Sequence, residues 1–85
     1  MARVEIYTAP SCPYCVRAKR LLQERGIAYE EFDVADDVEL REDVVARSGR
    51  RTVPQIFIGG KAIGGFDELA ALDARGELTD LVGVD

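Results

Sequence analysis

The chain has 85 residues, of which 47% are hydrophobic and 32% are charged, and its formal net charge is 11 − 16 = −5. This length fits a single domain, and the composition is typical of a soluble, globular protein. The negative charge disfavours general binding to nucleic acids or anionic membranes. The N-terminus lacks the apolar core of a signal peptide, and no apolar run approaches the roughly 18 residues of a membrane span. We therefore expect a cytoplasmic monomer without nucleic-acid or membrane partners.

The first third of the chain predicts a strand, a helix and a second strand. Residues 3–8 are rich in β-branched and aromatic side chains, which favour a strand. Pro13 suits the first position of a helix over residues 13–25, where a missing amide hydrogen costs nothing. Gly26 suits the C-terminal cap of that helix, and residues 27–34 follow as a strand. This spacing is that of a βαβ unit, whose two strands lie parallel.

The middle of the chain predicts a surface helix followed by a hairpin. Aspartates at positions 36 and 37 can cap a helix over residues 36–48. Residues 54–58 have the apolar character of a buried strand, and residues 61–63 return as a short strand after the Gly-Gly turn between them.

The last third of the chain predicts one more helix and an apolar turn. Asp67 can cap a helix that runs to about Arg75, and Leu78, Leu81 and Val82 supply the last apolar turn. The predicted order is βαβαββα, an α/β fold with a mixed sheet of four strands flanked by three helices. We expect residues 1–85 to form this one domain.

The only two cysteines, Cys12 and Cys15, stand three positions apart where the first helix begins. Unpaired amides and the positive end of the helix dipole favour an ionised sulfur at Cys12. Cys15 shares the inward face of the helix with Ala18 and Leu22, so we expect it to be buried and protonated. Residues at i and i+3 lie about 5–6 Å apart at Cβ, so the pair can close a disulfide. These are the requirements for a nucleophile and a resolving thiol.

Three interpretations of the cysteine pair are open. A structural disulfide is disfavoured in a reducing compartment. A zinc or iron–sulfur site takes about four ligands, and this chain has two cysteines and no histidine, so that a metal would have to be shared between chains. Cys-x-x-Cys beside a βαβ unit is a redox signature. Thiol–disulfide exchange, without a bound metal or permanent cofactor, is therefore favoured.

Three motifs carry a family resemblance: CPYC at 12–15, TVPQIFIGG at 52–60 and IGGFDEL at 63–69. Together, and over nearly the whole chain, they resemble the glutaredoxins, in particular the dithiol, bacterial glutaredoxin 3-like type. The resemblance implies a thioredoxin fold and a glutathione-dependent thiol–disulfide oxidoreductase, with glutathione as co-substrate. Its implied partners are proteins that carry a disulfide or a mixed disulfide with glutathione, with ribonucleotide reductase as one candidate.

The same resemblance implies which residues bind glutathione. The backbone of Val53, in a cis peptide with Pro54, would pair with the cysteinyl part, with Thr52 beside it and Tyr14 flanking the groove. Without the resemblance, the less favoured alternative for Pro54 is a plain strand starter, whereas Tyr14 is equally a core aromatic residue.

The γ-glutamyl end of glutathione would lie at Gly65, Phe66 and Asp67, where a helix N-terminus offers amides to its carboxylate. The Asp67 side chain would meet the ammonium group, although capping the helix is its simpler role. Phe66 stands where close relatives often have cysteine, a change that a backbone contact survives.

One position departs from the family pattern. Ala9 stands where family members often carry a lysine or arginine for the glycine carboxylate of glutathione. Arg41 and Arg51 are candidates to supply that charge, or are simply solvated. Two other functions are alternatives: a redoxin reduced by thioredoxin reductase, and a module that holds an iron–sulfur cluster with glutathione.

Overall fold

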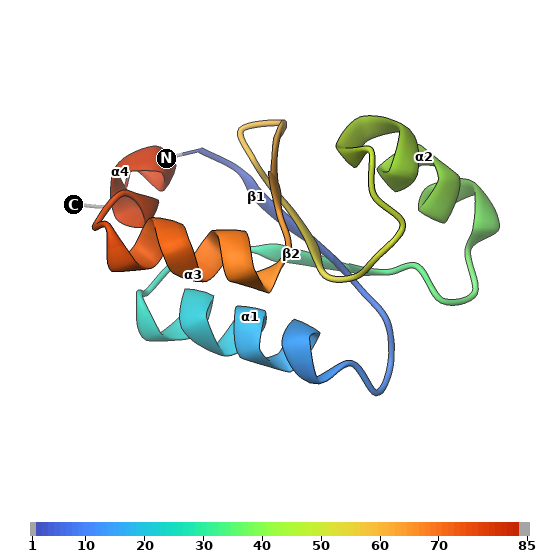
Figure 1. The fold of residues 1–85 in the computed structure, drawn as a ribbon, viewed down its shortest axis with the longest axis horizontal. Coiled ribbons are helices and arrows are strands. Elements are labelled where there is room, and N and C mark those ends of the chain that lie inside the picture. Colours follow the sequence, from blue (N-terminus) through green and yellow to red (C-terminus); the bar gives the residue numbers. More distant parts are fainter. Residues whose placement is uncertain (1, 84–85) are drawn as a thin grey trace.

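The computed structural model of the chain describes residues 2–83, so residues 1, 84 and 85 of the expected domain lie outside that range. Eight elements follow in chain order (Figure 1): β1 Val4–Thr8, α1 Pro13–Glu24, β2 Glu30–Asp33, α2 Val38–Ser48, β3 Gln55–Ile58, β4 Lys61–Gly64, α3 Phe66–Ala74 and α4 Leu78–Val82. The predicted order is confirmed as far as α3. The expectation of three helices is wrong, because the last apolar turn closes as the short helix α4, which ends where Gly83 adopts a left-handed φ of 85°.

The four strands form one mixed sheet in the order β2-β1-β3-β4. Strands β1 and β2 are parallel, as a βαβ unit requires, whereas β3 is antiparallel to both β1 and β4. The second strand is shorter than predicted and begins at Glu30. Its expected first residue, Ile27, instead donates its amide to the Leu22 carbonyl (2.9 Å) and so completes the end of α1.

Helices cover both faces of this sheet (Figure 1). On one face α1 and α3 lie side by side, and α1 buries Leu22 against Ile56 and its neighbours. On the other face α2 packs Val44 into a smaller cluster with Phe57. Ile56 and Phe57 serve opposite faces because side chains alternate along a strand. In the described part of the chain, no helix is both long and apolar enough to cross a membrane.

The ends of α1 follow from its sequence. Cys12 is the N-cap, with an extended backbone, and Pro13 takes the first helical position, where no amide is needed. Gly26 follows the C-cap with a φ of 68°, and its amide donates to the Gln23 carbonyl (3.1 Å). The helix therefore starts at the cysteine pair and presents its open amides there.

Candidate active site

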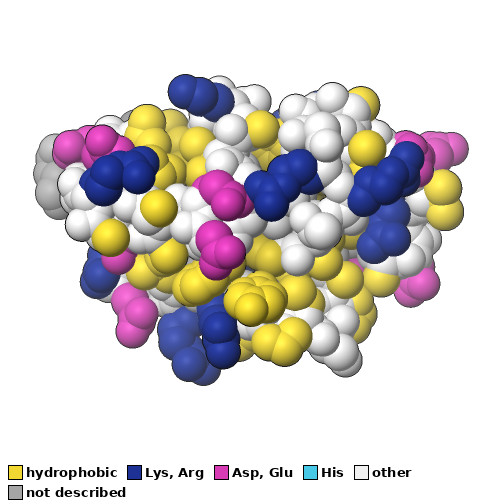
Figure 2. Space-filling model, viewed as in Figure 1, with side chains coloured by type: hydrophobic (Ala, Val, Ile, Leu, Met, Phe, Trp, Pro, Cys, Tyr) yellow, Lys and Arg dark blue, Asp and Glu magenta, His cyan; other side chains and the backbone are white. Residues whose placement is uncertain are grey.

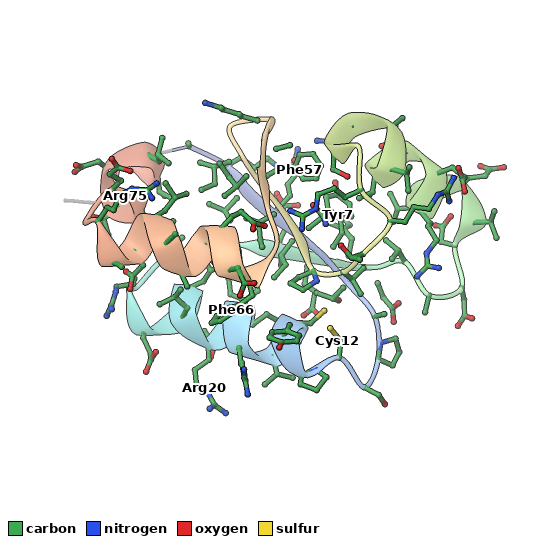
Figure 3. All side chains as sticks on the ribbon, viewed as in Figure 1. Tyr7, Cys12, Arg20, Phe57, Phe66 and Arg75 are labelled. Atoms are coloured by element: carbon green, nitrogen blue, oxygen red, sulfur yellow. The ribbon has the colours of Figure 1, made fainter. Side chains whose placement is uncertain are left out.

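The Cys12 sulfur sits at the N-terminus of α1, near the end of α1 that lies beside the start of α3 (Figure 3). It is partly exposed, and it accepts a hydrogen bond from the Cys15 amide at 3.2 Å. Its thiol also lies 3.8 Å from the carbonyl oxygen of Val53, as a donor to that oxygen. Ser11, directly before it, has a φ of 59°, a left-handed conformation that turns the chain into the helix. The sulfur is thus accessible and fixed by backbone groups on two sides.

Cys15 has a different environment. Its residue is 2% exposed, on the inward face of α1 with Ala18 and Leu22, which confirms the predicted burial. Removal from water first, and the hydrogen bond with Cys12 second, raise the pKa of the Cys15 thiol to about 12. An accessible sulfur and a protonated, shielded thiol are therefore one helical turn apart.

This asymmetry predicts the alkylation pattern of the reduced protein. With a pKa of about 12, the Cys15 thiol is ionised in only about 1 molecule in 10⁵ at pH 7. Because the thiolate is the reacting species, iodoacetamide should modify Cys12 alone near neutral pH, and Cys15 only as the pH approaches 12. Fragment-ion mass spectrometry locates the label. Two labels on the folded protein at neutral pH would contradict the assigned burial.

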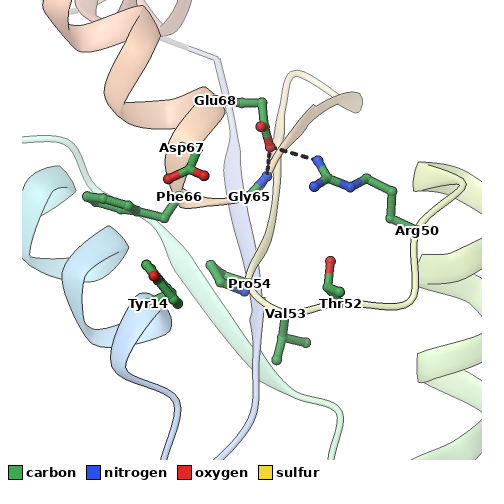
Figure 4. A pocket seen from close by; sticks show the side chains of 9 residues that line it. All are labelled: Tyr14, Arg50, Thr52, Val53, Pro54, Gly65, Phe66, Asp67 and Glu68. Atoms are coloured by element: carbon green, nitrogen blue, oxygen red, sulfur yellow. Dashed lines mark hydrogen bonds and ion pairs between the residues drawn. The ribbon is translucent and has the colours of Figure 1, made fainter.

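A groove of about 230 Å³ lies beside the cysteines (Figure 4). One wall is aromatic, where the ring of Tyr14 from α1 and the ring of Phe66 from α3 lie 6.2 Å apart between centroids. Its floor is the segment Thr52–Pro54, in which the Val53–Pro54 peptide is cis. Tyr14 is 52% exposed, so its interpretation as a core aromatic residue is wrong. Figure 2 shows a hydrophobic patch where α1 meets α3, with Asp and Glu side chains above it and Lys and Arg side chains below it.

The far wall of the groove is the N-terminus of α3, and its capping differs from the prediction. Gly65 is the N-cap and Asp67 is the second residue of the helix, so Asp67 does not cap it. The open amide of Gly65 donates instead to Glu68 Oε1 at 2.7 Å, and Arg50 donates to the same oxygen at 2.7 Å. The Gly65 amide first, and Arg50 second, hold the pKa of the Glu68 carboxyl below its ordinary value.

The predicted groove residues divide into two groups. Seven of them line the groove: Tyr14, Thr52, Val53, Pro54, Gly65, Phe66 and Asp67. Arg41 and Arg51 do not; they border a smaller hollow next to it, which shares Arg50, Thr52 and Val53 with the groove. Arg51 is turned outward and lies 3.4 Å from Glu42.

Sequence reasoning missed two lining residues, Arg50 and Glu68. A signal for Glu68 was present, because a glutamate three positions after an N-cap commonly reaches back to the N-cap amide. No comparable signal distinguishes Arg50 from its neighbour Arg51, since the direction of a loop side chain depends on the backbone that carries it.

Three comparisons with known proteins agree with this geometry. The glutaredoxin family model matches residues 4–63. Glutaredoxin 3 of Escherichia coli (strain K12) is 54% identical over 82 residues, which cover 96% of this chain and 99% of that protein. The solution structure of glutaredoxin from Brucella melitensis is 49% identical, with a TM-score of 0.88, and covers 99% of this chain and 91% of that one.

A third relative was solved with a ligand. The crystal structure of a buckwheat glutaredoxin–glutathione complex matches with a TM-score of 0.88 and 28% identity, over 96% of this chain and 77% of that one. The thioredoxin-like fold that the sequence motifs implied is thereby confirmed.

Proposed function

This chain belongs to the glutaredoxin family and is a glutathione-dependent thiol–disulfide oxidoreductase, and from that premise we propose that Cys12 is its nucleophile and Cys15 its resolving thiol. The observation that carries the proposal is the contrast between the two sulfurs. Cys12 is partly exposed and accepts a helix amide, while Cys15 is buried one turn below it. An attacking thiol needs access and a stabilised anion, and a resolving thiol needs protection from other partners.

In the glutathione route, the Cys12 thiolate attacks the glutathione sulfur of a protein–glutathione mixed disulfide. The protein thiolate leaves and takes up a proton, and glutathione remains on Cys12. A second glutathione, as its thiolate, then attacks that sulfur and leaves as glutathione disulfide, which restores the Cys12 thiolate. Cys15 takes no part in this route.

In the dithiol route, Cys12 attacks a protein disulfide and forms a mixed disulfide with one of its sulfurs. Cys15 then attacks the Cys12 sulfur, the substrate leaves as a dithiol, and the Cys12–Cys15 disulfide is left for glutathione to reduce. Proteins with accessible disulfides are the substrate class, and ribonucleotide reductase is one candidate.

Glutathione carries two carboxylates, an ammonium group and a peptide backbone. The groove beside Cys12 has a partner for each of these groups. The free edge at Val53 offers backbone hydrogen bonds to the cysteinyl part. The α3 amides of Phe66 and Asp67 face the γ-glutamyl carboxylate, and the Asp67 carboxylate suits the ammonium.

The glycine carboxylate of glutathione would meet Arg50, which lines the groove opposite the aromatic wall. This arginine makes up for the missing cation at position 9. Arg41 and Arg51, at the adjoining hollow, add positive charge on the same side.

A coupled assay with glutathione and glutathione reductase tests the groove. Arg50→Ala and Asp67→Asn should each raise the KM for the glutathionylated substrate by about 2- to 5-fold, with little change in kcat, because each removes one exposed charge pair with the ligand. Arg75→Ala is the matched control, since Arg75 pairs with Glu77 at the other end of α3. Unchanged KM values in both groove variants would contradict the assigned contacts.

The same assay separates this function from its alternative. A redoxin dedicated to thioredoxin reductase would turn over with that enzyme and not with glutathione.

We also propose that residues 1–85 form one domain, which acts as a cytoplasmic monomer.

A further inference from the structure

A second hollow, of about 200 Å³, reaches the cysteine pair and shares no lining residue with the groove. Both cysteines line it, together with Lys19 from α1 and with Glu31 and Asp33 from β2. Neither route described above gives a role to its charged side chains. The charged side chains of this hollow therefore lie near the buried Cys15 thiol and not near the groove proposed for glutathione.

The charges in this hollow are held in place. The Lys19 ammonium lies 3.0 Å from Glu31 Oε2, and the Thr8 hydroxyl donates to the same oxygen at 2.8 Å. Asp33 is engaged separately, as the acceptor for the amide of Ala35. Lys19 follows Cys15 by four positions, so both side chains lie on the same face of α1. The cation is thus fixed on the side of the helix that carries the resolving thiol.

Cys15 needs such a cation at one moment of its reaction. Only a thiolate attacks a disulfide, and burial opposes ionisation of Cys15. A backbone hydrogen bond at Ala9 and, to a smaller extent, Lys19 act in the opposite direction, and Lys19 is the charged group lining this hollow that favours the anion. Its effect is greatest while Cys15 is a full thiolate, because negative charge leaves the attacking sulfur as the bond to Cys12 forms.

We propose that Lys19 assists the resolving step: its ammonium, held by Glu31, stabilises the thiolate that forms on Cys15 before this sulfur attacks Cys12. The inference rests on the proposed roles of the two cysteines. In this step the Cys15 S–H bond breaks and its proton passes to water in the hollow. The Cys15–Cys12 bond forms, the bond from Cys12 to the substrate sulfur breaks, and that sulfur leaves as a thiolate and is protonated. In this step Cys15 goes from thiol to disulfide and the substrate sulfur returns to thiol; over the attack by Cys12 and this step together, the cysteine pair is oxidised by two electrons and the substrate is reduced by two.

The resolving step can be measured alone. Reduced protein treated with glutathione disulfide forms a mixed disulfide on Cys12, and its conversion to the Cys12–Cys15 disulfide releases glutathione, which acid quenching and mass spectrometry follow in time. Lys19→Met should slow this closure about 5-fold and move its pH profile to higher pH. Lys19→Arg, which keeps the charge, should restore the rate.

Two glutamate variants distinguish this role from others. Glu31→Gln removes the charge that holds the ammonium but keeps an oxygen that can accept its hydrogen bond, so closure should slow less than in Lys19→Met. If Glu31 instead accepted the Cys15 proton, Glu31→Gln would slow closure more than Lys19→Met does. Glu30→Gln is the matched control, because Glu30 is the neighbouring residue and pairs with Arg3 outside this hollow.

Three results would overturn the inference alone. The first is disulfide closure at the wild-type rate in Lys19→Met. The second is closure in Glu31→Gln that is slowed as much as in Lys19→Met. The third is that Lys19→Met, in a Cys15→Ser background, slows formation of the mixed disulfide as much as it slows closure, which would place its effect at Cys12. A wild-type protein that never closes the disulfide would overturn the cysteine roles as well.

Discussion

Replacing Cys12 by serine is expected to abolish reduction of both glutathione mixed disulfides and protein disulfides, with a loss of at least about 10³-fold in kcat. Both routes begin with attack by this sulfur and proceed through a disulfide on it. A serine hydroxyl is scarcely ionised at neutral pH and cannot form that intermediate. The coupled glutathione reductase assay measures the first activity, and loss of a reporter protein disulfide measures the second.

Cys15→Ser is the matched variant for this prediction. It should keep the glutathione route, which needs one thiol, and lose the dithiol route, which needs two. The role assignment is wrong if Cys15→Ser loses all activity toward glutathione mixed disulfides, or if Cys12→Ser retains any appreciable part of it.

Phe57→Ala should lower the free energy of unfolding by about 3–5 kcal/mol. Phe57 is fully buried at the centre of the sheet, and its ring meets Tyr7 edge-on at 5.5 Å between centroids. On its other side the Arg47 guanidinium lies 4.2 Å from the ring centroid. Truncation leaves a cavity between β3 and α2, and the loss is a large share of the roughly 5–15 kcal/mol that small domains have. Urea unfolding followed by circular dichroism gives the value.

The control for this stability measurement is Val38→Ala. Val38 is 74% exposed at the start of α2, so its truncation should change the free energy of unfolding by less than about 0.5 kcal/mol. A Phe57→Ala protein as stable as the Val38→Ala protein would show that α2 does not depend on this cluster.

The sequence predicted those features that rest on local chemistry. Pro13 and Gly26 mark the two ends of α1 because one lacks an amide and the other adopts a left-handed φ. The apolar run over residues 54–58 predicted β3, and the helical spacing of Cys15 predicted its burial. From the motifs alone, most of the groove could be assigned.

The errors occurred where neighbours distant in sequence decide the structure. The N-cap of α3 is Gly65 and not Asp67, at a point where the chain passes close to Pro54. A Cβ atom on Gly65 would lie 3.3 Å from the Pro54 carbonyl oxygen, so the bare backbone suits this contact. Sequence position alone also does not show that Arg50 turns into the groove, whereas its pairing with Glu68 across that groove does.

The pairing of Glu68 with Arg50 and with the Gly65 amide affects how ligand affinity depends on ionic strength. Arg50 and the Gly65 amide already bind an anion that the protein itself supplies, the Glu68 carboxylate. An arriving carboxylate that takes Arg50 replaces one counterion by another, so it gains less from Arg50 than it would from an unpaired arginine. Because dissolved salt weakens the broken pair and the new pair alike, affinity at this wall should vary little with ionic strength.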